Sequence, residues 1–269
     1  MDKIVLSNTF TAGEGGTITL SAPLLDVENK GTIQAATQLD GKGGHISLNV
    51  DTLHIHKGGL ITTETIAKGT GGSIKIQSND IQLTEKSSIT ADSLGLGNAG
   101  NILMHIEDSL QMQNSTLKTE TISADGGNLH ITSPGYLYLT NSEITTSVQA
   151  IHGNGGNTTL KPEFIVLNKS HIKADASRGK GGNIQITTTG IYNFSGESIN
   201  KIITASSQLG IQGEINIKSP DINLDEFLVV LPNKPLEAKL IRCNIQDFEN
   251  LIHLRIIRTL IKSPPFLKY

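Results

Sequence analysis

The chain has 269 residues, enough to enclose a large apolar core, and a formal net charge of -3 that is spread over both signs. No block of basic residues stands out, so the sequence predicts neither a nucleic-acid partner nor stable membrane insertion. With 28 Gly, no Trp and 4% aromatic residues, the composition disfavours a helical bundle and favours short strands between glycine-rich turns.

The first twelve residues contain no apolar stretch of the kind that forms a signal-peptide core, and no small-residue cleavage site. We interpret residues 1–12 as the last strand of a truncated coil. If the parent protein is exported, its signal is expected outside this chain.

From residue 13 onward, glycine-rich turns recur at a nearly constant spacing. The last glycines of successive turns lie 28, 28, 28, 27, 29, 26 and 31 residues apart. These glycines are Gly16, Gly44, Gly72, Gly100, Gly127, Gly156, Gly182 and Gly213. A fixed period of this length is typical of a repeat architecture, in which each repeat is one stacked unit.

Each repeat carries apolar residues that alternate with polar ones. The first pair after each turn is Ile18/Leu20, Ile46/Leu48, Ile74/Ile76, Ile102/Met104, Leu129/Ile131, Thr158/Leu160, Ile184/Ile186 and Ile215/Ile217. The second pair is Leu53/Ile55, Ile81/Leu83, Leu110/Met112, Leu137/Leu139, Ile165/Leu167 and Ile222/Leu224. A third inward position is Ile33, Ile61, Ile89, Leu117, Ile144, Ile172 and either Ile199 or Ile202. Alternation over such short segments predicts strands with one buried face.

These patterns predict an all-β fold, a right-handed parallel β-helix of about eight coils with three strands in each coil, over residues 1–231. The turn glycines are expected where neighbouring coils approach closely or where φ is positive. Asn101, Asn128, Asn157 and Asn183 follow four of the turns and are expected to stack as an amide ladder. Variable polar loops are expected at 35–40, 64–68, 91–97 and 174–180.

The repeat stops at Pro232, and residues 232–269 are predicted to form a C-terminal cap or tail, helical over 247–262 or disordered. The apolar-rich stretch 251–261 is too short to span a bilayer. Cys243 is the sole cysteine, which excludes an intrachain disulfide and a cysteine-based metal site.

The repeat motif resembles that of filamentous-haemagglutinin-like exoproteins, the adhesins of two-partner secretion. The residues that carry the resemblance are Gly181-Gly182-Asn183-Ile184-Gln185-Ile186 and Ser87-Ser88-Ile89-Thr90-Ala91, and the pattern covers about residues 1–231. The resemblance implies a C-terminal repeat fragment of a protein that an outer-membrane two-partner transporter exports. It implies a secreted or cell-surface location for the parent, and host, neighbouring-cell or matrix glycans or proteins as partners.

The expected function is therefore structural and adhesive rather than catalytic. The alternative is a β-helix enzyme, a polysaccharide lyase or hydrolase, which needs carboxylates or basic groups converging on one face. Asp80, Asp108, Asp125, Asp175 and Asp221 occupy different places in their repeats, so we interpret them as solvated loop carboxylates. An ice-binding array would need regular threonine columns, and Thr62-Thr63 and Thr145-Thr146 are too irregular.

No cofactor or metal is predicted. His54 and His56 flank the inward Ile55, and His45 lies on a neighbouring strand, but no fourth ligand can be named and we interpret them as exposed polar side chains. The glycine turns lack the aspartate that calcium-binding nonapeptide repeats need, and no phosphate-binding Gly-Lys-Ser/Thr motif occurs.

Overall fold

The computed structural model describes residues 4–10, 13–148 and 153–219 of the chain. These residues belong to a first unit that spans 1–221, and the second unit, 222–269, lies outside them. The predicted boundary at 231/232, the predicted helix over 247–262, Ile222/Leu224, Asp221 and Cys243 therefore all lie outside the described residues.

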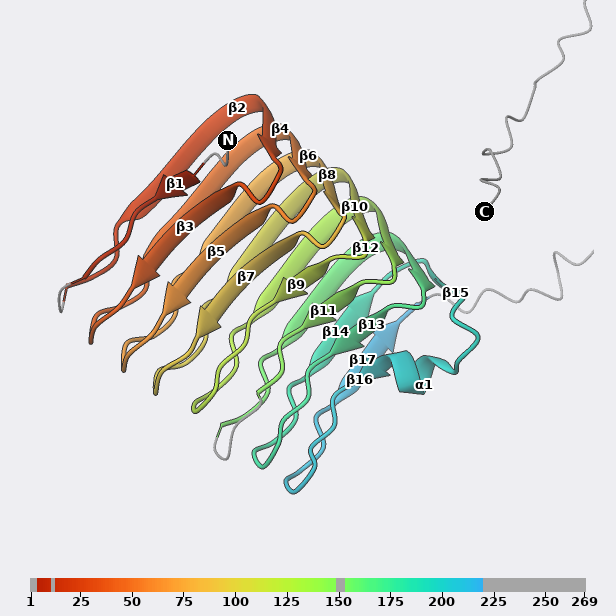
Figure 1. Ribbon diagram of the computed structural model, residues 1–269. Coiled ribbons are helices and arrows are strands. Elements are labelled where there is room, and N and C mark those ends of the chain that lie inside the picture. The colour runs from red at the N-terminus through yellow and green to blue at the C-terminus, as the bar shows by residue number, and fades with distance from the viewer. Residues whose placement is uncertain (1–3, 11–12, 149–152, 220–269) are drawn as a thin grey trace, which may run out of the picture. The chain divides into compact units, whose positions relative to one another are not determined.

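The described chain is an all-β parallel β-solenoid of about seven turns with almost no helix, which confirms the predicted fold class (Figure 1). Each turn contributes one long strand and one short strand. The long strands are β2 (Thr17–Val27), β4 (His45–Ile55), β6 (Ile74–Thr84), β8 (Ile102–Gln113), β10 (Leu129–Thr140) and β12 (Thr158–Asn168). The same side continues with β14 (Ile184–Thr187), β15 (Gly190–Asn193) and β17 (Ile215–Lys218).

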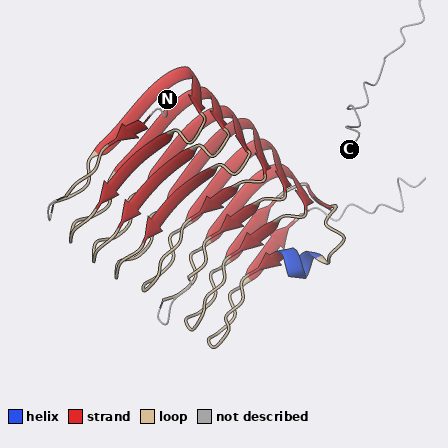
Figure 2. Ribbon diagram, in the orientation of Figure 1, coloured by secondary structure: helices blue, strands red, loops and turns tan. Residues whose placement is uncertain are grey.

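The short strands are β1 (Ile4–Leu6), β3 (Thr32–Thr37), β5 (Leu60–Thr65), β7 (Ser88–Ser93), β9 (Thr116–Lys118), β11 (Glu143–Thr145), β13 (His171–Lys173) and β16 (Ile203–Thr204). Within the described residues the short strands form an eight-stranded sheet and the long strands a nine-stranded one. Every recorded pair is parallel, with each strand next to its counterpart one coil away (Figure 2). We call these the short-strand sheet and the long-strand sheet.

The predicted count of three strands per coil differs from the structure, because the first two predicted strands are continuous. In β4 the inward residues are Ile46, Leu48 and Val50, and then Leu53 and Ile55, so two consecutive residues face outward between the two sets. At this bend the register shifts between β6 and β8 and between β10 and β12, as at a β-bulge. The strand therefore turns a corner without ending.

Buried hydroxyl groups stabilise this corner in several coils. Ser133 Oγ donates a hydrogen bond of 3.0 Å to the carbonyl oxygen of Asp108, one coil earlier. Ser78 and Thr188 make the same bond to Asp51 and Glu163, at 3.2 and 2.8 Å. Each hydroxyl thus joins the corner of one coil to a backbone carbonyl of the preceding coil.

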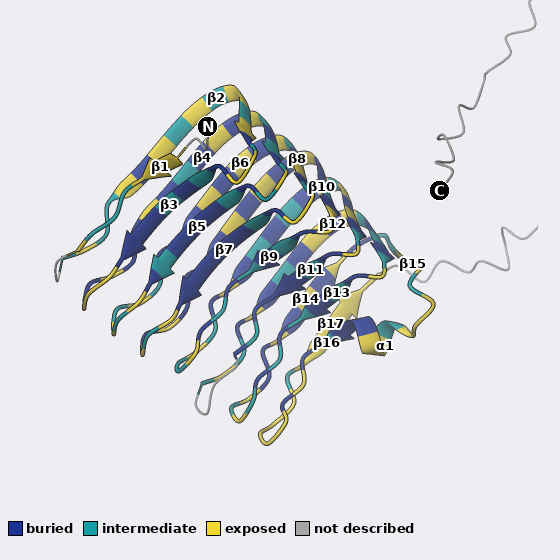
Figure 3. Ribbon diagram, viewed as in Figure 1, coloured by how far each residue is buried: buried dark blue, intermediate teal, exposed yellow. Residues whose placement is uncertain are grey.

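The predicted inward residues form one continuous core (Figure 3). Leu53, Ile81, Leu110, Leu137 and Ile165 are each 0% exposed. The end of the stack differs, because Ile215 and Ile217 are 41% and 38% exposed. They lie on β17, the last described strand, and no later described coil covers them.

The inward position on the last short strand also differs from the prediction. Ile203, rather than Ile199 or Ile202, pairs with Ile172 in register. The four-residue helix α1 (Ile199–Ile202) precedes it and was not predicted, although Ile202 is buried beside Ile203. No described helix has the length and apolar character of a membrane span.

The turn glycines are required by close approach along the stack. A Cβ added to Gly100 would lie 1.6 Å from the carbonyl oxygen of Gly72, and one added to Gly127 would lie 1.7 Å from that of Gly100. Among the described turn glycines only Gly153 has a positive φ, 112°, and an added Cβ there would also clash with the carbonyl oxygen of Ala124. The expectation of close approach is thus confirmed for the column, whereas positive φ is the exception.

The expected asparagine ladder forms, but mainly through the backbone. The Oδ1 atoms of Asn101, Asn128 and Asn157 accept hydrogen bonds from the backbone N–H of the next asparagine, at 2.8, 3.1 and 3.0 Å. Only Asn157 also donates its side-chain amide, to Asn128 at 3.1 Å. Each asparagine therefore fixes the first residue of the following coil.

The loops between each short strand and the next long strand project together at one edge of the stack (Figure 1). They bond to one another, since Gly43 N donates to Thr70 O at 2.8 Å and Leu96 N to Ala67 O at 3.2 Å. Three of the four predicted loops began too early, whereas the loop predicted at 174–180 begins directly after β13 (His171–Lys173). Residues 35–37, 64–65 and 91–93 belong to β3, β5 and β7.

Candidate functional site

The outer face of the short-strand sheet is hollowed into a groove of about 490 Å³ between its strands and the projecting loops. Its floor is made by β9, β11 and β13, and the chain after β16 closes one side with Ser206 and Gln208. Two further hollows adjoin it at the turns before these strands and share Thr116, Lys118 and Glu143 with it. We call this surface the sheet groove.

Register places the outward side chains of the sheet groove in three columns. The first column contains Thr116, Glu143 and His171, and the second contains Thr62, Thr90, Lys118, Thr145, Lys173 and Thr204. The third contains Glu64, Asp92, Glu120, Ser147, Asp175 and Ser206. Neighbours within a column belong to adjacent coils, about 4.8 Å apart.

Lysines join the columns by ion pairs. Lys118 Nζ lies 3.0 Å from Asp92 Oδ2 in the preceding coil and 3.0 Å from Glu120 Oε2 in its own coil. Lys173 Nζ lies 2.9 Å from Glu143 Oε1. The sheet groove therefore holds both signs of charge side by side, with carboxylates in excess because Lys118 is shared by two of them.

Asp92 is the most enclosed of these carboxylates, with 12% of its side chain exposed. Burial raises its pKa above the ordinary value, because the effect of desolvation exceeds the opposing effects of Lys118 and the Glu120 backbone N–H. Burial acts to lower the pKa of Lys118, but Asp92 and Glu120 outweigh it and hold that pKa above its ordinary value. The charged lysine is thus retained in a partly desolvated position.

Asp175 closes the groove at its far end through hydrogen bonds. Its Oδ1 accepts from Ser206 N at 2.7 Å and from Ser206 Oγ at 2.8 Å, and its Oδ2 accepts from Thr204 Oγ1 at 2.9 Å. As predicted, Asp175 lies outside the strands, just after β13, and is partly exposed; it also belongs to the third column and ties two coils together.

The other predicted loop carboxylates do not join the sheet groove. Asp80 lies on β6 and accepts a hydrogen bond from Ser109 Oγ at 2.7 Å. Asp108 is exposed on β8. Asp125 lies in a projecting loop, where it accepts from Asn154 N at 2.8 Å. Asp80 and Asp108 thus lie on adjacent strands rather than in loops, at the same corner, because Asp80 pairs in register with Ser109, whereas Asp125 lies apart from them in its loop.

Sequence reasoning missed the third column because it compared aspartates alone. Glu64, Asp92, Glu120 and Asp175 each stand three residues after a third inward position, namely Ile61, Ile89, Leu117 and Ile172. Counting aspartate and glutamate together from that reference would have found the column without coordinates.

The predicted outward histidines have separate partners. His56 Nε2 lies 2.8 Å from Asp26 Oδ1, and His45 Nδ1 accepts a hydrogen bond from Ser73 N at 3.2 Å. Ile55 between His54 and His56 is fully buried, as predicted. The described residues contain no cluster of three or more histidine, cysteine or acidic side chains arranged to hold a metal ion.

The irregular threonine pairs face opposite sides of the sheet. Thr62 points outward and shares a hydrogen bond of 2.8 Å with Thr90, while Thr63 is buried and donates to the carbonyl of Gly72 at 3.1 Å. Thr146 is likewise buried and donates to Gly156 at 2.7 Å. Thr63 and Thr146 thus use their hydroxyls to bond buried backbone carbonyls.

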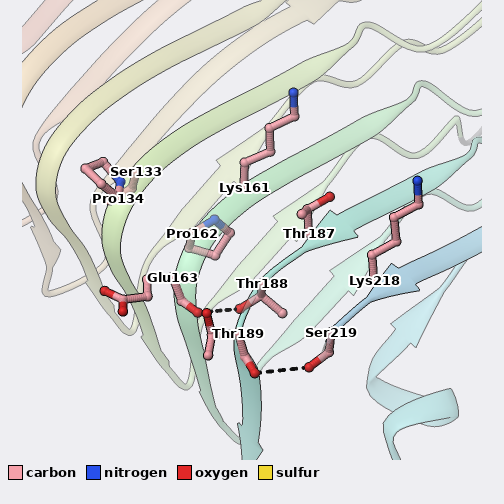
Figure 4. Close-up of a pocket in the computed structure, with 10 residues that line it drawn as sticks. All are labelled: Ser133, Pro134, Lys161, Pro162, Glu163, Thr187, Thr188, Thr189, Lys218 and Ser219. Atoms are coloured by element: carbon pink, nitrogen blue, oxygen red, sulfur yellow. Dashed lines mark hydrogen bonds between the residues drawn. The ribbon is translucent and has the colours of Figure 1, made fainter. Parts of the chain in front are cut away.

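A separate hollow, of about 610 Å³, lies at the corner of the long-strand sheet near its last described strands (Figure 4). Thr188 Oγ1 donates to the carbonyl of Glu163 at 2.8 Å, and Ser219 Oγ donates to that of Thr189 at 3.1 Å. Lys161 and Lys218 extend away from Glu163 in this view. The charged groups of this hollow do not converge on one point.

Comparison with protein-family models, with curated proteins and with solved structures finds no match for this chain. The class that the coordinates define is a parallel β-solenoid with a polar groove along its short-strand sheet.

Proposed function

We propose that this chain is a non-catalytic structural and adhesive segment of a secreted or cell-surface exoprotein of the filamentous-haemagglutinin-like class. The observation that carries the proposal is the sheet groove, in which polar side chains stand in register across successive coils. A surface of this kind offers polar contacts at each coil, so weak contacts with an extended partner add together.

The mixed charge of the sheet groove bears on the kind of partner. Lys118 and Lys173 are each paired with carboxylates, and carboxylates outnumber these lysines, so the groove offers both donors and acceptors with an excess of acceptors. Such a surface suits polar glycans or proteins on host cells, neighbouring cells or the surrounding matrix. For the parent protein, the proposal implies export through an outer-membrane two-partner transporter encoded beside its gene.

Binding of the full chain to immobilised cell-surface and matrix glycoproteins tests the adhesive role. The double variant Glu143→Gln/Lys173→Gln removes the ion pair of 2.9 Å on the groove floor. The matched control Glu14→Gln/Lys42→Gln removes an exposed loop pair of 3.5 Å, with the same change in charge. We expect binding by the wild type and the control and at least tenfold weaker binding by the groove variant. Absence of wild-type binding, or equal binding by all three, would overturn the proposal.

One observation favours a second candidate, a carbohydrate-cleaving enzyme. Asp92 and Glu120 are carboxylates in adjacent coils, and burial raises the pKa of Asp92, as a general acid requires. Against this role, Lys118 holds both carboxylates at 3.0 Å, so neither is free to act as a base or nucleophile. Release of reducing ends or unsaturated sugars from a polysaccharide panel, lost in Asp92→Asn and Glu120→Gln, would establish the enzyme and refute the non-catalytic proposal.

A further inference from the structure

Four aromatic side chains gather on the outer face of the long-strand sheet. Tyr136 and Tyr138 lie on β10, Phe164 on β12 and Tyr192 on β15, and these three strands are neighbours. The tyrosines are 44%, 42% and 48% exposed. We call these four residues the aromatic patch. The whole chain has only ten aromatic residues, so nearly half of them share one surface.

The rings are held close to one another. Tyr136 pairs in register with Phe164, and Tyr138 with Val166, which in turn pairs with Tyr192. The ring centroids of Phe164 and Tyr192 lie 6.1 Å apart at an interplanar angle of 43°. Gly190 lies beside both rings, since a Cβ added there would be at the ordinary contact distance of 3.6 Å from an atom of each. Phe164 therefore lies between Tyr136 and Tyr192 across three neighbouring strands.

Fold stability alone does not require exposed rings at these positions. The inward residues of the same strands, Leu137, Leu139, Ile165 and Leu167, already fill the core and are 0% exposed. In the earlier coils the column that leads to Tyr138 holds Asp26, His54, Gln82 and Gln111. The fold therefore accepts polar residues at this outward position in the earlier coils. In the last coils the outer face instead exposes aromatic rings to solvent, as binding surfaces do.

The outward residues in register with the rings carry no charge, and the ionisable residues beside them in the sequence, Asp108 and Glu163, are both carboxylates. Gln111 donates its side-chain amide to Tyr136 Oη at 3.2 Å, which holds that hydroxyl at the edge of the patch. The outward residues in register with the rings are Ser109, Gln111, Val166 and Gly190, none of which is ionisable. Flat apolar rings bordered by hydroxyl and amide groups match a pyranose ring, which has an apolar C–H face and a rim of hydroxyls.

We infer that the aromatic patch binds a neutral polysaccharide, with sugar rings stacked on Tyr136, Phe164 and Tyr192 and sugar hydroxyls bonded to Gln111 and the tyrosine hydroxyls. The absence of ionisable groups among these register positions favours a neutral chain over an acidic one. This inference deepens the proposed adhesive function by naming a ligand class, but it concerns a surface separate from the sheet groove.

Tyrosine fluorescence of the full chain gives a direct test, because the chain has no Trp and three of its four tyrosines lie in the patch. The probes are cellohexaose, xylohexaose and mannohexaose, with hexagalacturonic acid for comparison. We expect the tyrosine fluorescence to change saturably with at least one neutral hexasaccharide, and the acidic hexasaccharide to bind at least tenfold more weakly. Failure of all three neutral probes, or equal binding of the acidic one, would overturn the inference.

Variants measured by calorimetry locate the binding. Tyr136→Ala and Tyr192→Ala should each weaken saccharide binding by at least about tenfold. Tyr192→Phe should retain most of the affinity because it keeps the ring. Phe10→Ala is the control, since Phe10 is 63% exposed on another part of the surface. Loss of binding in the control equal to that in the tyrosine variants would contradict the assignment.

Two further readouts separate the alternatives. Acrylamide should quench the patch tyrosines readily in the free chain; strong protection would mean that another segment or a second copy covers the rings, which would overturn the inference. The Glu143→Gln/Lys173→Gln variant should bind the hexasaccharide normally. If it loses glycoprotein binding while keeping the saccharide, the sheet groove and the aromatic patch act independently, and both proposals stand.

Discussion

Lys118 joins Asp92 across two neighbouring coils, with 3.0 Å between Nζ and Oδ2, although only 12% of the Asp92 side chain is exposed to solvent. The pair places a charged contact on the wall of the solenoid, where each partner depends on the other. Removal of one partner therefore has a different consequence from removal of an exposed ion pair.

We expect Lys118→Met to lower the free energy of unfolding by about 1–3 kcal/mol, because it leaves a poorly solvated carboxylate without its cation. Lys42→Met removes an exposed partner of Glu14 and should change the free energy by less than about 0.5 kcal/mol. Denaturant unfolding measures both. Equal effects of the two substitutions would show that the Asp92 environment is fully hydrated.

The raised pKa of Asp92 predicts a pH dependence of stability. Because the folded-state pKa lies above the ordinary value of 3.8, the folded chain takes up a proton at Asp92 before the unfolded chain does. As pH falls through the folded-state pKa toward 3.8, wild type should gain stability relative to Asp92→Asn, and this contribution should be lost again as pH rises. Paired unfolding measurements across that acidic range test the sign; a relative loss for wild type on acidification would refute it.

Gly100→Ala should disrupt the stack, because the new Cβ would meet the carbonyl oxygen of Gly72 at 1.6 Å. Neighbouring coils would have to separate to relieve this clash. We therefore expect the free energy of unfolding to fall by more than about 4 kcal/mol, or the chain to fail to fold. Gly190→Ala is the matched control, since its Cβ would find ordinary contacts at 3.6 Å, and it should cost about 1 kcal/mol or less. Thermal unfolding compares the two.

Ser133→Ala tests the corner of the long strand. The substitution removes the hydrogen bond of 3.0 Å to the Asp108 carbonyl and should cost about 1–3 kcal/mol, the effect of a buried polar group left unsatisfied. Ser198→Ala changes the same atoms at an exposed residue that makes no side-chain cap, and should be nearly neutral. Similar unfolding midpoints for the two variants would show that water replaces the Ser133 hydroxyl at the corner.

The sequence was sufficient to predict the stacking of the coils and most of the core residues. Leu53, Ile81 and Leu110 recur at equivalent places in their repeats, and all three are fully buried. The long strands were harder to predict. Val50 and Leu53 both face inward, so the alternation breaks between them, and this break was interpreted as the end of one strand and the start of another. The coordinates show a bulged corner within a continuous strand.

The candidate site was predicted less completely than the core. Asp175 was considered, but its companions Glu64, Asp92 and Glu120 were not, because a column becomes visible only when every repeat is aligned on one inward residue. The aromatic patch was also missed. Tyr138 and Tyr192 are far apart in the sequence, and Val166 stands between them in register.

By itself, the sequence determined that like strands stack in parallel, because only that arrangement buries an apolar set repeated at a fixed period while glycines admit the neighbouring backbone. The tertiary structure decided which outward side chains become neighbours: Lys118 with Asp92, and Phe164 with Tyr192. The physical reason is that solvent-facing positions are not constrained by burial, so their contacts depend on register and on the bend of the long strand, which the inward pattern does not specify.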